Sequence, residues 1–255
     1  MTIEIATIPC LEDNYAYIIH NHTENKTCLV DAPEATAIKN FLKQKAWNLD
    51  KIFLTHHHSD HVDGVKELLE DYPATIAGAS ADFNRLPTLD EKLKQNDTFR
   101  LGSLEFLILE VHGHTIGHIA LYSKKKSAVF SGDSLMTLGC GRLFEGTPKI
   151  MWTTLQKFRE LPPDTKIYSG HEYGQKNAHF AISVDPHNKK LQKRVSLIEE
   201  LRDHGNPTVP STIRSELETN PFMRVGSIEI KKGLKMTECE DYKVLGELRR
   251  RRDIF

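Results

Sequence analysis

Hydrophobic and polar positions alternate in short blocks through the first part of the chain. The segments EIATIP, NYAYIIHN and TCLVDAP are rich in β-branched and aromatic residues, and the polar stretches LEDN and HTENK separate them. Blocks of this kind are typical of strands joined by turns. We therefore expect the opening of the chain to be mostly sheet.

A helical period follows. In EATAIKNFLKQKAW the apolar residues return every three or four positions, which predicts an amphipathic helix, and DKIFLT then predicts a buried strand. Directly after the next polar stretch, VDGVKELLEDYP places Val62, Val65, Leu68 and Leu69 on one helical face, and Pro73 closes the segment.

The middle of the chain repeats this pattern. TIAGAS, LEFLILEV, HIALYSK, SAVFSGD and TKIYSGHEY predict strands, and PKIMWTTLQKFREL predicts a helix with Pro148 in its first turn. Beyond Tyr173 the pattern changes to helices and loops with little strand signal. We place a domain boundary near Gly174, which gives a strand-rich domain over residues 1–174 and a helical domain over residues 175–255. The two strand-rich runs could be two halves of a sandwich.

The overall composition is that of a globular protein. The chain has 255 residues, of which 39% are hydrophobic and 27% charged, so it can bury a core. No apolar stretch approaches the roughly 20 residues that a membrane-spanning helix needs. The N-terminal segment MTIEIATIPC lacks a basic region followed by a long apolar region, so a secretory signal is not expected. We expect a cytoplasmic protein with no membrane partner.

Charge and cysteine content exclude further classes. The net charge of −1 gives no reason to expect nucleic acid as a partner. Cys10, Cys28, Cys140 and Cys239 lie far apart and form no CxxC pair, so we expect buried, reduced thiols rather than disulfides or a zinc ribbon. No apolar repeat indicates an obligate interface, and we expect a monomer.

The stretch THHHSDH, directly after an apolar strand, is the strongest chemical signal. His56, His58 and Asp60 alternate, so an extended segment would point all three to one side and His57 away from it. His61 then begins the next helix. Imidazole nitrogens and carboxylate oxygens are ligands that zinc and other first-row metals accept. The stretch therefore predicts a metal site, with His57 outside it.

Three later stretches supply further ligands, each where a predicted strand becomes a loop. GHTIGH offers His114 and His118, FSGDSL offers Asp133, and YSGHEY offers His171. Alone, Asp133 would be read as a turn or cap residue and His171 as an ordinary loop histidine. Together with the first cluster they are candidate ligands, because residues at the ends of several strands can share one rim.

The motifs THHHSDH, GHTIGH, SGDSL and GHEY, in this order and at these intervals, resemble those of the metallo-β-lactamase superfamily. The segments IPCLEDNYAYII, GCGRLFEGTP, NPFMR and the terminal RRRRDIF resemble one member, the glyoxalase II or hydroxyacylglutathione hydrolase family. The similarity covers nearly the whole chain. It implies an α/β fold, an αββα metallo-β-lactamase sandwich with a small C-terminal α-helical domain.

The resemblance also implies two divalent metal ions, with zinc expected and iron or manganese as alternatives, since ligand type does not choose among them. It assigns His56, His58 and His114 to one ion, Asp60, His61 and His171 to the other, and Asp133 to both. Two of these residues, Asp60 and Asp133, are also implied as catalytic, with Asp60 orienting a metal-bound hydroxide. His118 matches a family position outside the ligand set.

The activity implied is hydrolysis of a glutathione thioester, S-D-lactoylglutathione, to D-lactate and glutathione in methylglyoxal detoxification. The glutathione contacts carried over from the family fall on Arg142, Phe144, Tyr173, Arg249 and Arg252. Phe144 departs from the tyrosine of many family members, which removes a hydroxyl contact. Without the resemblance, the terminal arginines would indicate a solvated helix face.

Other functions remain open from the residues alone. A persulfide dioxygenase of the same superfamily uses one iron and lacks the long C-terminal domain, so the residues after Gly174 count against it. Another hydrolase of the superfamily, including a metal-dependent nuclease, would share the ligands, although no large basic surface is evident. The non-enzyme alternative is a structural or sensor domain that holds metal with saturated coordination.

Overall fold

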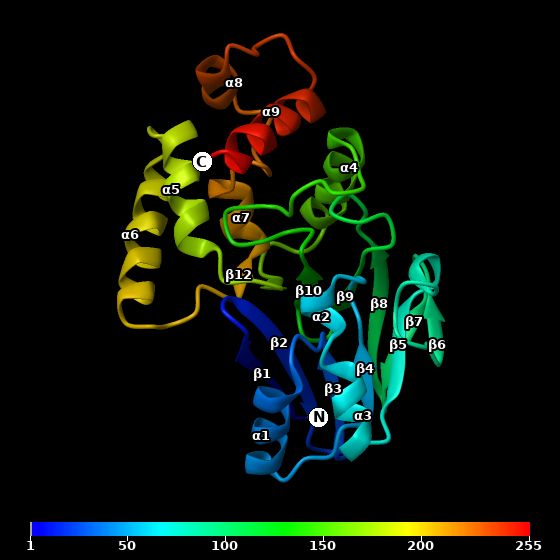
Figure 1. Cartoon of the computed structure of the whole chain (residues 1–255). Helices are drawn as coiled ribbons and strands as arrows, with labels where there is room; N and C mark the ends of the chain where they lie inside the picture. Colours follow the sequence, from blue (N-terminus) through cyan, green and yellow to red (C-terminus); the bar gives the residue numbers. More distant parts are fainter. Residues whose placement is uncertain (1) are drawn as a thin grey trace. The chain divides into compact units, whose positions relative to one another are not determined.

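The computed structural model describes residues 2–255, and these divide into two compact units. The first unit comprises the chain up to Glu110 together with Gly117–Lys126, and the second comprises Val111–Ile116 together with Ser127–Phe255. The domain boundary near Gly174 that the sequence suggested stays a prediction, because the two units interleave along the chain. Each unit is described by itself below, with element labels as in Figure 1.

The first unit contains most of the strands. Its elements are β1 (Ile3–Cys10), β2 (Asn14–Asn21), β3 (Lys26–Val30), α1 (Ala35–Lys45), β4 (Lys51–Phe53), α2 (Ser59–Val62), α3 (Val65–Asp71), β5 (Thr75–Ala79), the short 3₁₀ helix η1 (Ser80–Asp82), β6 (Glu91–Leu93), β7 (Thr98–Leu101), β8 (Leu104–Glu110) and β9 (Ile119–Ser123). The strand and helix positions predicted here are confirmed, but β6 and β7 had no clear sequence signal.

Six of these strands form one mixed sheet in the order β1-β2-β3-β4-β5-β6. The pairs β1–β2 and β2–β3 are antiparallel, whereas β3–β4, β4–β5 and β5–β6 are parallel. Parallel neighbours place their carboxyl ends at the same edge. In the pair β3–β4, Val30 lies opposite Phe53, so the residues that follow these two strands emerge together.

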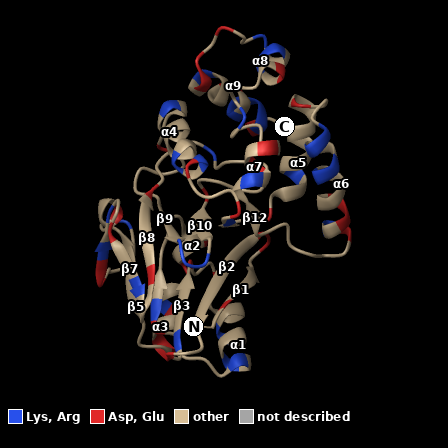
Figure 2. Ribbon diagram, turned by 180° about the vertical axis from the view of Figure 1, so that it is seen from behind, with Lys and Arg blue, Asp and Glu red and all other residues tan. Residues whose placement is uncertain are grey.

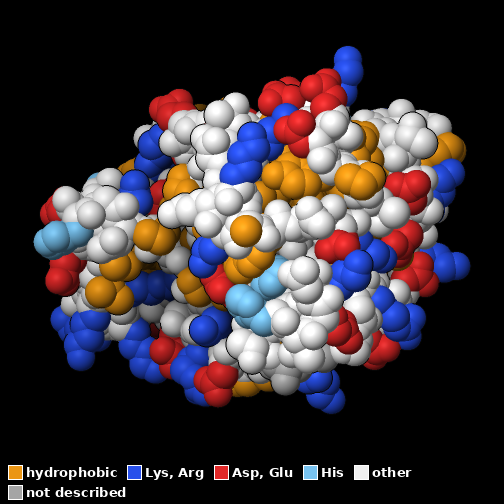
Figure 3. Space-filling model, turned by 90° about the horizontal axis from the view of Figure 1, so that it is seen from below, with side chains coloured by type: hydrophobic (Ala, Val, Ile, Leu, Met, Phe, Trp, Pro, Cys, Tyr) orange, Lys and Arg blue, Asp and Glu red, His pale blue; other side chains and the backbone are white. Residues whose placement is uncertain are grey.

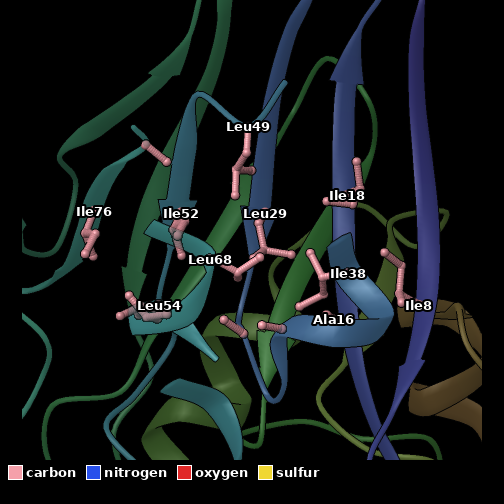
Figure 4. Close-up of a cluster of buried hydrophobic side chains, with 14 of the residues drawn as sticks. Ile8, Ala16, Ile18, Leu29, Ile38, Leu49, Ile52, Leu54, Leu68 and Ile76 are labelled. Atoms are coloured by element: carbon pink, nitrogen blue, oxygen red, sulfur yellow. The ribbon is translucent and has the colours of Figure 1, made fainter. Parts of the chain in front are cut away.

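Helices α1 and α3 cover one face of this sheet. Figure 4 shows Ile38 of α1 and Leu68 of α3 beside Leu29 and Ile52 of the sheet, and all four side chains are fully buried. Leu42 of α1 belongs to the same buried cluster. The apolar residues that recur every three or four positions in the sequence of α1 therefore form the face of the helix that is buried against the sheet. Helix α1 is capped by Ala46, which adopts the left-handed backbone conformation.

The strands β7, β8 and β9 form an antiparallel meander. Phe99 of β7 contacts Phe53 of β4 with ring centroids 5.6 Å apart, so the meander packs face to face against the mixed sheet within the first unit. Both rings are fully buried. The aromatic pair lies in the layer between two sheets, which is the arrangement of a sandwich.

The second unit is mainly helical. Its elements are β10 (Ala128–Gly132), α4 (Pro148–Arg159), β11 (Lys166–Ser169), α5 (Gly174–Val184), α6 (Lys189–Asp203), β12 (Ser211–Thr212), α7 (Ile213–Thr219), α8 (Ile228–Leu234) and α9 (Asp241–Asp253). Strand β10 is parallel to β11, and β11 is antiparallel to β12. The short strand β12 lies in a region where the sequence indicated helices and loops with little strand signal.

Local sequence explains where several of these helices begin. The Thr147 hydroxyl accepts a hydrogen bond from the Ile150 amide and Pro148 occupies the first turn of α4, as predicted. The Asn188 side chain caps α6 in the same way, accepting from the amides of Lys190 and Leu191. Lysine and arginine residues occur along α6 and α8 and in the last turns of α9 (Figure 2).

Candidate metal centre

The first cluster of predicted ligands lies where β4 runs into α2. The Nε2 atom of His56 and the Nδ1 atom of His58 lie 3.0 Å apart. Two ligands about 2.1 Å from one tetrahedral ion are separated by roughly 3.4 Å, so a nitrogen from each ring can reach the same ion. The alternation read from the sequence is confirmed for these two histidines.

Asp60 and His61 come from helix α2, which begins at Ser59. The prediction that an extended segment carries Asp60 is therefore wrong, because the chain is already helical there. The Oδ2 atom of Asp60 lies 3.8 Å from Nε2 of His61. Asn14 holds this carboxylate, donating from Nδ2 to Oδ2 of Asp60 at 3.0 Å and to its backbone oxygen at 2.9 Å.

Asp31 orients two of the histidines. Its Oδ2 atom accepts from Nδ1 of His61 at 2.8 Å and from the Thr55 hydroxyl at 2.8 Å. Because the Thr55 hydroxyl donates to Asp31, it accepts from Nδ1 of His56, 3.0 Å away. Both imidazoles therefore carry their proton on Nδ1, which leaves the lone pair on Nε2. In each ring Nε2 is the nitrogen that faces the neighbouring candidate ligand.

The Asp31 network is buried. Asp31, Thr55, His56 and His61 are each at most 2% exposed. Asp31 itself has a φ of 58°, in the left-handed region that aspartate tolerates better than most residues. A buried carboxylate is costly unless hydrogen bonds satisfy it, and here the Thr55 amide adds a further one at 2.8 Å. The sequence interpretation missed Asp31, although it directly follows strand β3.

His57 lies outside the cluster, as predicted. Its Nδ1 atom is 3.1 Å from Oδ2 of Asp82, whose other oxygen accepts from Nη2 of Arg85 at 2.5 Å. Asp82 is 1% exposed, and a Cβ atom at Gly117 would come within 2.0 Å of its carboxyl carbon. Asp82, which the sequence interpretation also missed, therefore fixes His57 in the middle of the histidine stretch.

His118 is buried in the first unit and stacks on His56, with ring centroids 4.6 Å apart and planes inclined by 13°. Its Nδ1 atom lies 3.2 Å from the backbone oxygen of Ile119. The ring packs against the face of His56, which suits the expected position of His118 outside the ligand set.

The second cluster lies within the second unit. Asp133 follows β10 and His171 follows β11, and because these strands are parallel neighbours the two residues emerge at one edge. The Oδ2 atom of Asp133 lies 3.4 Å from Nε2 of His114 and 3.3 Å from Nε2 of His171. One carboxylate oxygen thus faces two imidazole nitrogens at ligand-to-ligand distances.

The His114 ring is oriented from its other side. Its Nδ1–H donates to the backbone oxygen of Arg142 at 2.8 Å, which leaves the lone pair on Nε2, towards Asp133. Gly113, just before it, has a φ of 141°, and a Cβ atom at Gly146 would lie 2.5 Å from the Gly113 Cα. The close backbone approach here requires both glycines.

The predicted substrate residues near this cluster differ in exposure. Phe144 is 60% exposed, and its ring centroid lies 5.3 Å from that of His114 and 5.8 Å from the Arg142 guanidinium. The ring of Tyr173 stacks on His171 at 4.8 Å. Arg142 is largely exposed, with its Nε 3.2 Å from Oδ1 of Asp253.

The two arginines of α9 are more enclosed. Arg249 is only 9% exposed, and its Nη1 donates to the backbone oxygen of Cys140 at 2.6 Å. Arg252 donates from Nε to Oδ1 of Asn177 at 3.1 Å. Burial and the nearby Arg249 charge lower the pKa of Arg252 below its usual value, although an arginine remains charged at neutral pH.

All four cysteines are free thiols, as predicted. Cys10, Cys28 and Cys140 are buried, but Cys239 is partly exposed, so the expectation of burial is wrong for that residue. Burial raises the pKa of the Cys10 thiol to about 12 and that of Cys140 to about 11. The donor atoms gathered in the two clusters are imidazole and carboxylate groups, a set that suits zinc, iron or manganese.

No helix in the described part of the chain has the length and apolar character needed to cross a membrane.

Comparison with known proteins gives consistent matches. Residues 12–171 match the family model of the metallo-β-lactamase superfamily, and residues 172–255 match that of the hydroxyacylglutathione hydrolase C-terminus. The chain is 51% identical to the hydroxyacylglutathione hydrolase of Ruegeria pomeroyi over the full length of both proteins. The matches therefore cover the strand-rich and the helical parts alike.

Solved structures also resemble the chain. ETHE1 from Myxococcus xanthus aligns with a TM-score of 0.67 at 22% identity, covering 100% of this chain and 99% of that one, which shows the fold alone. A protein solved in a di-iron-bound form aligns with a TM-score of 0.55 at 26% identity, over 66% of this chain and 91% of that one. The predicted fold class, a metallo-β-lactamase α/β sandwich with a C-terminal helical region, is confirmed.

Taken with the full-length identity to a curated relative, the two family matches place this chain in the hydroxyacylglutathione hydrolase family of the metallo-β-lactamase superfamily.

Proposed function

We propose that the protein hydrolyses the thioester of S-D-lactoylglutathione, releasing D-lactate and glutathione, as a step of methylglyoxal detoxification. The observation that carries this proposal is the match of residues 172–255 to the C-terminal model of hydroxyacylglutathione hydrolases. The sandwich fold alone would support many substrates, because members of one fold often carry out different reactions.

Seven side chains would hold two divalent metal ions, with zinc as the proposed identity. Those proposed for one ion are His56, His58 and His114, those for the other are Asp60, His61 and His171, and Asp133 serves both. The geometry of each cluster supports this assignment: the imidazoles of His56, His61 and His114 present Nε2, and one oxygen of Asp133 faces two imidazoles. Such ions, when bound, would lower the pKa of a coordinated water molecule and polarise a substrate carbonyl.

The side chains of the protein position the reactants. The Asp60 carboxylate, held by Asn14, would accept a hydrogen bond from the attacking water and aim its lone pair at the thioester carbon. Asp31 keeps His56 and His61 in the tautomer in which they bind metal. The leaving thiolate of glutathione is stable enough to depart with little help from a general acid. Because water would attack the carbonyl carbon directly, the reaction needs no side-chain nucleophile and no covalent acyl-enzyme.

Substrate recognition would depend on the surface around the second cluster. The exposed Arg142 can bind a carboxylate of glutathione, Tyr173 offers a hydroxyl group, and Phe144 provides an apolar wall beside His114. Arg252 and the buried Arg249 add positive charge. The Arg249 guanidinium is only 9% exposed and pairs with Asp253, so its contact with glutathione is proposed from the family resemblance alone.

We also propose that the protein acts as a cytoplasmic monomer without nucleic-acid or membrane partners. Basic and acidic side chains are interspersed on the face shown in Figure 3, with apolar side chains between them. A nucleic-acid-binding surface would instead gather positive charge along one track. The net charge of −1 supports the same interpretation.

The test is to incubate the purified protein with S-D-lactoylglutathione, following loss of thioester absorbance and measuring bound metal by elemental analysis. We expect turnover with two ions per chain and its loss after chelation. A lactoyl thioester of a small thiol that lacks the glutathione peptide should react far more slowly. Equal rates with both thioesters, or oxygen consumption with glutathione persulfide instead of hydrolysis, would contradict the proposal.

A further inference from the structure

A loop formed by residues 136–142, between β10 and α4, connects the C-terminal helices to His114. Met136 and Gly139 exchange two backbone hydrogen bonds, at 3.1 and 3.0 Å, and Leu138 between them has a φ of 55°. The loop is therefore a tight turn, and it is almost entirely buried. Its backbone groups need partners from outside it, because a buried polar group without one is costly.

Side chains from the C-terminal part of the chain supply those partners. Asn177 donates to the backbone oxygen of Thr137 at 2.9 Å, and Asn220 donates to that of Gly139 at 3.0 Å. Fully buried Glu216 accepts from the Leu138 amide at 2.9 Å. The loop is thus held from α5, from α7 and from the residue that follows α7.

Arg249 of α9 makes the contact nearest to the metal ligand. Its Nη1 atom donates to the backbone oxygen of Cys140 at 2.6 Å, and its Nη2 lies 3.0 Å from Oδ1 of Asp253. The same Asp253 oxygen accepts from Nε of Arg142 at 3.2 Å. The Arg249 guanidinium also lies over the Phe222 ring, 5.3 Å from its centroid.

The other end of the loop contacts His114. The backbone oxygen of Arg142 accepts the Nδ1–H of His114 at 2.8 Å. A Cβ atom at Gly141 would lie 2.2 Å from the backbone oxygen of Asp133 and 2.8 Å from Nδ1 of His114, so the loop packs tightly against both residues. A shift of the Cys140–Arg142 backbone by a fraction of an ångström would lengthen the hydrogen bond to His114.

We propose that Arg249 is a positioning residue for His114: it holds the 136–142 loop so that the Arg142 carbonyl fixes His114 as the Nδ1–H tautomer, with Nε2 directed at Asp133. This role differs from the substrate contact that the arginine motif implies. It rests on the proposed function only in taking His114 as a metal ligand. The helical C-terminal part of the chain thereby supports the metal centre as well as the substrate.

The test compares four variants. Arg249→Met removes the guanidinium, and Arg249→Lys keeps the charge but replaces the planar fork of donors with one ammonium group. Arg142→Met removes a side chain but leaves the carbonyl that His114 needs. Arg250→Met is the matched control, because Arg250 lies one position along α9, is exposed and pairs with Glu247. Circular dichroism establishes that each variant is folded.

Three measurements separate a positioning role from substrate binding. The first is the rate of metal loss to a chelator, the second is the His114 tautomer in metal-free protein from ¹⁵N chemical shifts, and the third is the division of the effect between kcat and KM. We expect both Arg249 variants to lose metal roughly 10-fold faster or more, as happens when groups that orient a ligand are removed. We also expect them to show mixed His114 tautomers and a lower kcat.

Arg142→Met should raise KM while keeping the metal-loss rate and the Nδ1–H tautomer, and Arg250→Met should match the unmodified protein. If Arg249→Met does not fold, Arg249→Lys alone decides the question. Unchanged metal loss and an unchanged tautomer in Arg249→Lys, with only KM raised, would overturn the proposal. If the unmodified protein failed to hydrolyse the glutathione thioester, the proposed function would fail, yet the tautomer measurement would still test the role of Arg249.

Discussion

The Oδ2 atom of Asp31 accepts a hydrogen bond from Nδ1 of His61 at 2.8 Å, although the two residues are 30 positions apart in the chain. Through the Thr55 hydroxyl the same oxygen also orients His56. A single buried carboxylate therefore sets the tautomers of two proposed ligands, one for each ion, and its removal should affect both.

Replacing Asp31 with asparagine should weaken metal binding by about 10- to 100-fold. The amide has one accepting oxygen where the carboxylate has two, so at least one of the hydrogen bonds from Thr55 and His61 is lost. Each lost bond should cost about 1.5–3 kcal/mol in the free energy of unfolding. Metal titration and urea denaturation measure the two effects. The control is Asp71→Asn in α3, whose surface ion pair with Lys39 should contribute little to stability and nothing to metal binding. Metal affinity equal to that of the unmodified protein would show that Asp31 does not orient the ligands.

Replacing Asp133 with alanine should abolish both metal binding and turnover. Its Oδ2 atom faces His114 and His171 at 3.4 and 3.3 Å, and without that oxygen two proposed cations would face each other unscreened. Elemental analysis and the thioester absorbance assay measure the outcome. A variant that retained two ions per chain and full activity would refute the bridging assignment.

Replacing Phe144 with tyrosine should lower KM for the glutathione thioester by up to about fivefold and leave kcat nearly unchanged. The ring is 60% exposed beside Arg142 and His114, so a hydroxyl group fits without disturbing the core. One added hydrogen bond contributes about 1 kcal/mol. Phe83→Tyr, on the exposed surface of the first unit, is the control. An unchanged KM would mean that the substrate does not reach this position.

The cysteines should differ in reactivity towards iodoacetamide at pH 8. Burial raises the pKa of Cys10 to about 12 and of Cys140 to about 11, and it also raises that of fully buried Cys28, so these three thiols carry little thiolate and have no access to reagent. Cys239 is partly exposed and should react alone. Mass spectrometry should find one adduct in the folded protein and four in urea. Early modification of Cys140 would indicate that the 136–142 loop opens.

The sequence by itself determined most of the elements and all of the candidate ligands. Hydrophobic period is a local property, so the stripe of α1 and the buried strands β2 and β4 could be predicted from a few residues each. The three-residue strand β6 and the two-residue strand β12 could not, because a short polar segment becomes a strand only when a neighbouring strand pairs with it. The residues of THHHSDH could be assigned because their identities are unusual at the end of an apolar strand.

Only the tertiary structure decided how those ligands are held. Asp31 reaches Thr55 because β3 and β4 are parallel, with Val30 opposite Phe53, and no local pattern specifies that register. In the same way, Arg249 appears in the sequence as one of four similar arginines. Packing places it against the Cys140 carbonyl and leaves Arg250 in solvent. Hydrogen-bond partners depend on which distant segments the fold brings within about 3 Å of each other, and that is a property of the whole chain.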